Sequence, residues 1–427
     1  MKVRATHRVT ASAAVLAALY LSLNALAQVA GEPSPLALAE AIDLTLSTHP
    51  ELRLYSSTER RLTAERDVAA LRAQRSLEAE VENLGHSSGD TAAELTLSLA
   101  SVLERGGKRE ARIAVAASRL DALTLLREQT RLDLIAEAAR RYLEVVRAQE
   151  QVTLSAAEVA QRVRTVEAAA QRVQAGASPE SVRLTAEAAQ ARAQLEQARA
   201  DRDRTAAYRR LALLWGERSP ALRPVEGDLT LLPDVPTPEA LAELIQNTPD
   251  LARFADEQRL REARLQLARA ARQRDVNWRV GVRHLQEGDD WVAVGAVAVP
   301  LGSARRAEPE IRSAEAELDA LAIERQSAEL SLYATLVEAH GLYLGSKAEV
   351  EQSQAELVPR LESAATAAER AYRAGALSYL EWAQVQSETI VAREEQLDAA
   401  REAQLALIEI QRLTGQPFVE PGTEGGR

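Results

Sequence analysis

Two hydrophobic patterns alternate along the chain. Apolar residues recur at helical spacing in residues 38–48 and 238–247, which predicts two short helices. A second helix follows each of them and begins at Pro50 or at Pro249. We expect these second helices to run to about residues 75 and 274, because Arg, Ala, Leu and Glu dominate them. Both halves of the chain therefore open with the same pair of helices.

The pattern then changes to strict alternation of apolar and polar residues. This predicts a β-hairpin over residues 77–100 and another over residues 276–299. One face of each hairpin is apolar, and the charged residues on the other face are Glu78, Glu80, Glu82, Arg279 and Arg283. An apolar outside and a charged inside are typical of a water-filled membrane barrel, whose lumen these five residues would line. A soluble sheet with one face on a core is the alternative.

Helical spacing returns and continues for an unusual length. Residues 108–175 hold no glycine or proline, and a second long helix is expected over residues 310–373. A helix of ~65 residues is about 100 Å long, which exceeds an ordinary globular domain. Gly176 and Gly375 then predict tight reversals, each followed by a return helix of roughly 35 residues.

The two halves are copies of one unit. The turn glycines are 375 − 176 = 199 positions apart, and Tyr142 recurs as Tyr343 at an offset of 201. A period this long indicates a duplicated domain rather than a short-repeat solenoid. We divide the mature chain into a first repeat (28–216), a linker with four prolines (217–236), a second repeat (237–415) and a tail expected to be disordered (416–427).

The N-terminus has the pattern of an export signal over residues 1–27. Three basic residues precede an apolar stretch, and Ala25-Leu26-Ala27 offers a cleavage site. The chain has no cysteine, so it has no disulfide, and we expect no lipoprotein anchor. Its formal net charge of −11, which signal removal makes −14, argues against a nucleic-acid partner.

Sequence motifs for catalysis or cofactor binding are absent. The five histidines are scattered and form no spaced metal-binding cluster, so we expect neither a bound metal nor a cofactor. No nucleophile motif, phosphate loop or dinucleotide fingerprint occurs in the sequence, so we predict that the protein is not an enzyme.

The predicted elements need partners. Aromatic residues make up only 3% of the chain, and alanine-rich helices bury little area each, so they require neighbours along their length. Four strands leave two open edges, and a membrane tolerates only a closed barrel. We therefore expect other copies of this chain to complete the structure.

These residues resemble the TolC family of outer-membrane efflux proteins over almost the whole mature chain. The most specific stretches are residues 372–380 (YRAGALSYL) and their partner at 173–182. The sequences around residues 97–109 and 297–302 are similar to the heavy-metal, CzcC-like branch. The resemblance implies an α+β fold in which long helical hairpins form a periplasmic tunnel. It also implies a homotrimer whose strands close a 12-stranded barrel in outer-membrane lipid.

The resemblance also implies partners and site residues. It places this chain in the outer membrane, docked to a periplasmic adaptor and an inner-membrane pump of the resistance-nodulation-division type. The residues that it assigns to the adaptor-contact tips are Gly176, Ala177, Ser178, Pro179, Gly375, Ala376, Leu377 and Ser378. The pore gate would fall on Glu381 and Gln384, with Val182 at the matching place in the first copy.

Alternatives stay open at each level. The tip glycines are equally explained as ordinary helix ends, and Glu381 as a solvated glutamate on a helix face. A periplasmic adaptor or coiled-coil scaffold is the other function considered, although adaptors present one helical hairpin with β-rich domains that this sequence lacks. The exported compound is not specified by the sequence.

Overall fold

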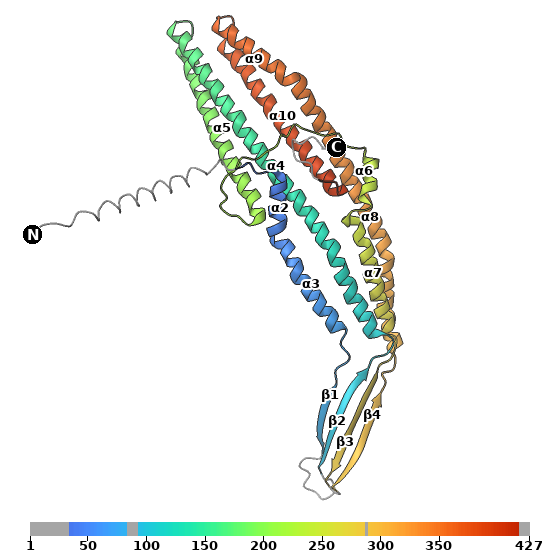
Figure 1. Cartoon of the computed structure of the whole chain (residues 1–427). Coiled ribbons are helices and arrows are strands. Elements are labelled where there is room, and N and C mark those ends of the chain that lie inside the picture. The colour runs from blue at the N-terminus through green and yellow to red at the C-terminus, as the bar shows by residue number, and fades with distance from the viewer. Residues whose placement is uncertain (1–33, 83–92, 287–288, 418–427) are drawn as a thin grey trace, which may run out of the picture.

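The computed structural model describes residues 34–82, 93–286 and 289–417. The expected signal peptide and nearly all of the expected tail lie outside these residues. Figure 1 shows a long molecule with four strands at one end and the tips of two helical hairpins at the other. Shorter helices and the linker lie against the long helices between the two ends.

The first repeat supplies two strands and two long helices. Its elements are α2 (Leu38–Thr48), α3 (Pro50–Ala69), β1 (Ser76–Glu82), β2 (Glu94–Leu103), α4 (Lys108–Gln174), α5 (Glu180–Ala212) and the 3₁₀ turn η1 (Leu213–Trp215). The helix α4 is 67 residues long, as its freedom from glycine and proline predicts. It pairs with α5 to form the first hairpin, which Figure 1 draws in green.

The second repeat repeats this order with one interruption. Its elements are α6 (Pro238–Ile245), α7 (Pro249–Ala270), β3 (Val276–Leu285), β4 (Asp290–Ala298), α8 (Ser303–Gln352), the π-helix η2 (Ser353–Leu357), α9 (Val358–Arg373) and α10 (Tyr379–Thr414). The continuous helix expected over residues 310–373 is therefore wrong in detail. Pro359 has no N–H and its ring clashes with the preceding turn, so the chain widens into a π-turn just before it.

Helices α3 and α7 end earlier than expected. They stop at Ala69 and Ala270, rather than near residues 75 and 274. The residues that follow form the crossings into β1 and β3, where the chain passes from a helical to an extended backbone. Composition alone overestimated both helices because Arg, Ala and Gln favour helix without requiring it.

The four strands form one antiparallel sheet in the order β1-β2-β3-β4. The central pairing joins the two repeats, with Thr96 opposite Arg283 and Leu97 opposite Val282. Within the described chain β1 and β4 each have a free edge. The expected α+β architecture of long helical hairpins and four antiparallel strands is confirmed.

The core lies at mid-height, where the linker crosses the helices. The Tyr142 hydroxyl lies within hydrogen-bond distance of the carbonyl oxygens of Leu36 (2.7 Å) and Glu226 (2.6 Å), and it accepts from the Glu226 N–H (3.1 Å). In the second repeat the buried Tyr343 donates to the carbonyl oxygen of Pro233. The duplicated tyrosines thus anchor both ends of the linker to the two long helices, because a buried hydroxyl must find an acceptor.

Alanine sets the packing distance of the first hairpin. The buried residues of α5 include four alanines at seven-residue intervals, namely Ala186, Ala193, Ala200 and Ala207. A heptad of small residues allows the backbone of α5 to lie close to α4 in a coiled-coil arrangement. No helix within residues 34–82, 93–286 and 289–417 combines the length and the apolar character needed to cross a bilayer.

Candidate channel wall and helix tips

The polar face of the sheet carries a ladder of ion pairs. Arg279 contacts Glu78 (2.9 Å) and Glu80 (3.8 Å). Four residues further along β3, on the same face, Arg283 contacts Glu94 (2.7 Å) and Glu82 (3.4 Å). The five charged residues predicted to line a lumen therefore lie together on one face, on β1 and β3 with β2 between them. Cross-strand pairs of opposite charge stabilise this register, because a one-residue slip would separate them.

The opposite face of the sheet is apolar, and no described part of the chain covers it. Leu77 is 73% exposed and Val297 is 72% exposed, although both sit in regular strands. Trp278 and Trp291 lie on this face near opposite ends of the sheet, as the register of β3 with β4 shows. A soluble sheet would cover such a face, and lipid covers it in a membrane wall.

Gly281 lets β3 lie close to β2 on the polar face of the sheet. It lies opposite Ser98, between the two arginines of the ladder. A side chain on Gly281 would come within 2.6 Å of the Ser98 Cβ atom and 2.4 Å of the Leu97 carbonyl oxygen. Glycine in a strand marks such a close approach.

Both hairpins turn through the same hydrogen-bonded motif. Gly176 and Gly375 have φ angles of +68° and +81°, the left-handed region that glycine adopts without strain. In the first tip the Ala177 N–H donates to the Arg172 carbonyl oxygen (2.8 Å), and the second tip repeats this with Ala376 and Ala371 (2.9 Å). These contacts are those of a Schellman helix end, so the glycines have a structural role at the tips.

Arg172 joins the two tips, which sequence reasoning missed. Its Nε donates to the Ser178 hydroxyl (3.2 Å) and its Nη2 to the Ala177 carbonyl oxygen (3.3 Å) in the first tip. Its Nη1 donates to the Tyr372 carbonyl oxygen in the second hairpin, and its guanidinium lies 4.9 Å from the centre of the Tyr372 ring. One side chain therefore holds two reversals that are 199 residues apart.

An aromatic cluster supports the second tip. The Tyr372 and Trp382 rings stack with centres 4.7 Å apart, and both side chains are buried. The Tyr372 hydroxyl and the Trp382 indole N–H find no hydrogen-bond partner in the described chain. The remaining buried, unpartnered side-chain polar atom in the described residues is the Ser353 hydroxyl in η2. All three atoms thus belong to the second hairpin, which carries a polar cost that the described first hairpin lacks.

The expected gate residues have local partners. Glu381 accepts hydrogen bonds from the Ser378 hydroxyl (2.6 Å) and backbone N–H (2.9 Å), and the Ser378 hydroxyl accepts from the Glu381 N–H (3.3 Å). This capping box begins α10, and the two bonds from Ser378 lower the pKa of the Glu381 carboxyl. Gln384 donates to Glu388 (2.8 Å). Both residues lie on the first turns of α10, beside the second tip.

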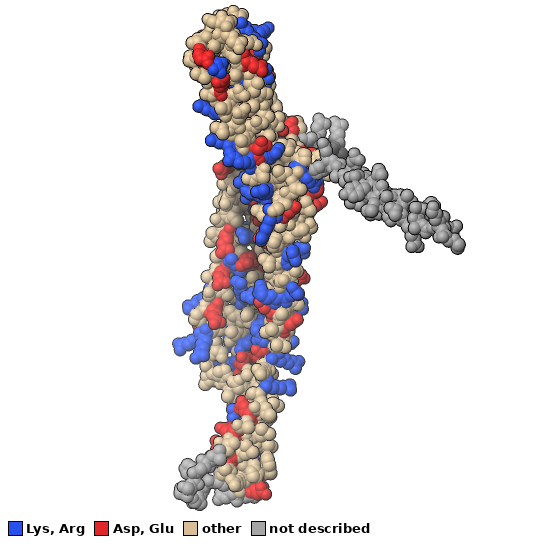
Figure 2. Space-filling model, turned by 90° about the vertical axis from the view of Figure 1, so that its left-hand side faces the viewer, with Lys and Arg blue, Asp and Glu red and all other residues tan. Residues whose placement is uncertain are grey.

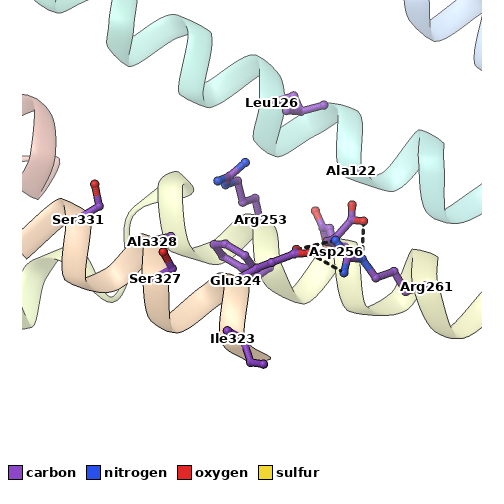
Figure 3. Close-up of a pocket in the computed structure, with 12 residues that line it drawn as sticks. Ala122, Leu126, Arg253, Asp256, Arg261, Ile323, Glu324, Ser327, Ala328 and Ser331 are labelled. Atoms are coloured by element: carbon purple, nitrogen blue, oxygen red, sulfur yellow. Dashed lines mark hydrogen bonds and ion pairs between the residues drawn. The ribbon is translucent and has the colours of Figure 1, made fainter. Parts of the chain in front are cut away.

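A large cavity lies between α4, α7 and α8 and has a volume of about 730 Å³. Figure 3 shows Arg261 and Glu324 meeting across it, at 2.6 Å. Arg261 also contacts Glu257 (2.8 Å), and the buried Asp256 pairs with Arg259. Most charged groups of this cavity are paired with one another, so it is better explained as a gap between helices than as a ligand site.

The described histidines have separate structural partners. His49 caps α3, His284 contacts Asp289 (2.8 Å), and His340 contacts the Pro236 carbonyl oxygen (3.0 Å). Within the described ranges no three His, Asp or Glu side chains are grouped so that they could hold a metal ion. His86 lies outside the described residues.

Comparison with known proteins agrees with this geometry. The model of the family "outer membrane efflux protein" matches residues 50–217. The chain is 28% identical over 314 residues to the cobalt-zinc-cadmium resistance protein CzcC of Cupriavidus metallidurans, covering 74% of this chain and 75% of that protein.

Solved structures show the same fold. VceC, an outer membrane protein of Vibrio cholerae, superposes with a TM-score of 0.72 at 18% identity, over 90% of this chain and 97% of VceC. The open MtrE outer membrane channel of Neisseria gonorrhoeae gives 0.70 at 19% identity, over 89% of each chain. Together with the charged and apolar faces of the sheet and the duplicated hairpins, these likenesses show that the chain has the fold of outer membrane efflux channels, and its residues 50–217 match the family of outer membrane efflux proteins.

Proposed function

We propose that this protein is the outer-membrane channel of a tripartite efflux system, assembled from three copies of the chain. The sheet carries the argument. Its apolar face is exposed, its charged face is internally paired, and both of its edges are free in the described chain. Three sheets of four strands would close a 12-stranded barrel with a charged lumen, and closure would satisfy the free edges.

Unpartnered helix faces lie on the same flanks as the free strand edges. Figure 1 shows α3 leading into β1 on one flank and α8 following β4 on the other. Along α8, apolar side chains are exposed at seven-residue intervals at Ile323, Leu330, Val337 and Leu344. The α3 flank exposes Leu54 and Val68. In the proposed trimer the α8 stripe packs on α3 of the next copy, because such a stripe needs a coiled-coil partner.

The tips are the proposed docking surface for a periplasmic adaptor, which would connect the tunnel to an inner-membrane pump. The small residues around both tip glycines permit close backbone approach. The first tip presents Ser178 and Pro179, whereas the second presents Leu377 and Ser378. We propose two non-identical grooves between adjacent tips, and a gate carried mainly by Glu381 and Gln384 of the second copy. The exposed carboxylate of Glu381 is the supporting observation.

Divalent metal cations are the first substrates to test. The relative CzcC is named for resistance to cobalt, zinc and cadmium, and the branch motifs of this sequence are similar to it. The lumenal face carries more acids than bases in β1–β3, which favours cations. An apolar, exposed sheet face is not explained by the alternative of a periplasmic scaffold.

Fractionation and conductance test the channel directly. We expect the protein in the outer-membrane fraction, as a trimer that migrates anomalously before heating and that conducts ions in planar bilayers. Cysteines at Ala177 and Ala376 should crosslink to the cognate adaptor, whereas a cysteine at Arg199 in mid-α5 should not. Recovery as a soluble monomer without detergent would contradict the proposal.

A further inference from the structure

Seven exposed arginines lie where the chain crosses between the sheet and the helices. Arg72 and Arg75 are in the crossing from α3 to β1, and Arg105 is in the crossing from β2 to α4. Arg272 and Arg274 are in the crossing from α7 to β3. Arg305 and Arg306 are in the first turn of α8, directly after the crossing from β4. We call these seven residues the arginine collar.

Hydrogen bonds hold the crossings at one level of the molecule. The Arg105 N–H donates to the Asp275 carboxylate (3.1 Å), and Lys108 pairs with the same carboxylate (2.7 Å). The Ser101 hydroxyl donates to the Gln74 carbonyl oxygen (3.1 Å), which joins the first crossing to β2. The fourth crossing follows from the sheet register, in which Asn277 faces Ala298. The arginines, although up to 234 positions apart, therefore form one band (306 − 72 = 234).

The band has a net positive charge, whereas the whole chain has a net negative charge. Residues 70–75, 104–109, 271–275 and 300–306 hold nine Lys or Arg and two acids, a net charge of +7 (9 − 2), in a protein whose formal net charge is −11. None of the seven collar side chains has an ion pair or hydrogen bond with any part of the chain that the structure describes. Figure 2 shows Lys and Arg gathered over the strand-proximal half of the helices.

Local structure does not explain these residues. Arg305 and Arg306 occupy the first turn of α8, where a helix dipole disfavours cations and an acid is expected. Exposed apolar residues lie beside the collar in the sequence, since Leu71 precedes Arg72 and Leu301 lies four residues before Arg305. The collar also directly borders the apolar face of the sheet, two residues before Leu77 and two after Leu103.

We propose that the arginine collar binds the anionic headgroups of phospholipids in the periplasmic leaflet of the outer membrane. This inference rests on the proposed function, because it needs the apolar face of the sheet to lie in lipid. The border between an apolar face and a band of unpaired arginines is where phosphate groups of a bilayer lie. Arginine binds phosphate in two-point contacts while its aliphatic stem lies against acyl chains.

Asymmetry of the sheet supports this choice of leaflet. The opposite end of the sheet carries four acids near the hairpin ends, Glu82, Glu94, Asp289 and Asp290, against one arginine, Arg283, which pairs with the first two. A cationic ligand or a divalent ion suits that end, and an anionic lipid does not. The collar thus distinguishes the two membrane surfaces and would set the depth of the channel in the bilayer.

Lipid retention by the purified trimer tests the collar. Native mass spectrometry would compare the binding of dioleoyl-phosphatidylglycerol and dioleoyl-phosphatidylcholine to the full protein released from detergent. The collar variant replaces four arginines by glutamine, at Arg75, Arg105, Arg274 and Arg305. The matched control removes four exposed arginines without ion pairs from the helices near the tips and core, at Arg164, Arg192, Arg209 and Arg210.

We expect wild type and control to retain phosphatidylglycerol in preference to phosphatidylcholine, and the collar variant to lose at least tenfold in apparent affinity. Each arginine near an anionic surface contributes about fivefold. Equal binding of both lipids by wild type, or an unchanged preference in the collar variant, would overturn the collar. In that case the trimer and its conductance would persist. A protein that forms no trimer and conducts no ions would instead overturn the proposed function.

Discussion

Single side chains connect parts of the molecule that the sequence separates widely. Arg172 joins the two tips, and its partners Ser178 and Tyr372 come from different repeats. The residue at the matching place in the second copy is Ala371 (172 + 199), so the duplication gives no sign of this contact. It became visible only when the fold brought the hairpins side by side.

Replacing Arg172 by alanine is expected to separate the tips. The change removes three hydrogen bonds and the contact with the Tyr372 ring, and should lower the free energy of local opening by about 2 kcal/mol. Spin labels at Ala177 and Ala376 would report a broader distance distribution. Arg164→Ala, on the same helix and without an ion pair, is the control. Identical distributions for both variants would rule out the link.

The start of α10 is expected to depend on pH. Its capping box lowers the folded-state pKa of Glu381 below the ordinary value of 4.5, so its stabilisation is present above that value and is lost as the pH falls through the lowered one. Amide exchange of residues 379–383 should therefore accelerate as the pH is taken from 6 to 3, relative to the intrinsic rate. Glu381→Ala should show fast exchange already at pH 6. A pH-independent protection in wild type would contradict this role of the carboxylate.

Helices and strands were predicted correctly where the sequence pattern is compatible with only one local structure. Strict alternation placed Glu78 and Arg279 on the same face of the sheet, because side chains in a strand have a period of two. The positive φ of Gly176 and Gly375 followed from the need to reverse a long helix. Element ends were less certain, since the crossings after Ala69 and Ala270 have helix-favouring composition.

Two local signals in the sequence correspond to features of the second hairpin. Ser378 followed by Glu381 three residues later is a capping-box pattern, and it could have predicted the observed hydrogen bonds. Pro359 stands inside a helical pattern and marks the π-turn that the structure contains. The arginine collar could not be predicted in this way, because four separate crossings supply it and only the sheet register brings them together.

Pairing of β3 with β2 is expected to depend on Gly281. Valine at this position would meet Ser98 and the Leu97 backbone, which cannot move without breaking the β2–β3 pairing, at a cost of about 1–3 kcal/mol. We expect less heat-modifiable trimer in the membrane fraction. Gly295→Val in β4 is a matched control, since its added Cβ would meet nothing closer than 3.8 Å. Equal yields from the two variants would contradict the close approach.

At the scale of the whole molecule, the single chain is an incomplete wall. Its exposed α8 stripe includes Ile323 and Leu330, whose side chains are 70% and 64% exposed in the described chain. An isolated chain would gain nothing from these residues. In the proposed trimer they would lie in the interface between α8 of one copy and α3 of the next. Burial of each side chain there would contribute about 1.5–3 kcal/mol to the stability of the trimer.

Placing glutamates on the stripe is expected to prevent assembly without unfolding the chain. Ile323→Glu with Leu330→Glu puts charges where the proposed trimer is buried, so sedimentation in detergent should show monomers with unchanged helix content. Leu222→Glu with Leu231→Glu, in exposed positions of the linker, should leave the trimer intact. A stable trimer from the stripe variant would place the interface elsewhere.

The three unpartnered polar atoms and the π-turn all belong to the second hairpin, whereas α4 runs unbroken for 67 residues. In a ring of three chains, continuous first hairpins would therefore alternate with second hairpins that contain a π-turn. The opening between the six tips of the proposed trimer would then widen as a triangle rather than as a circle, because only the second hairpin of each chain bends. A docked adaptor could then stay bound to the three first hairpins while the channel opens and closes.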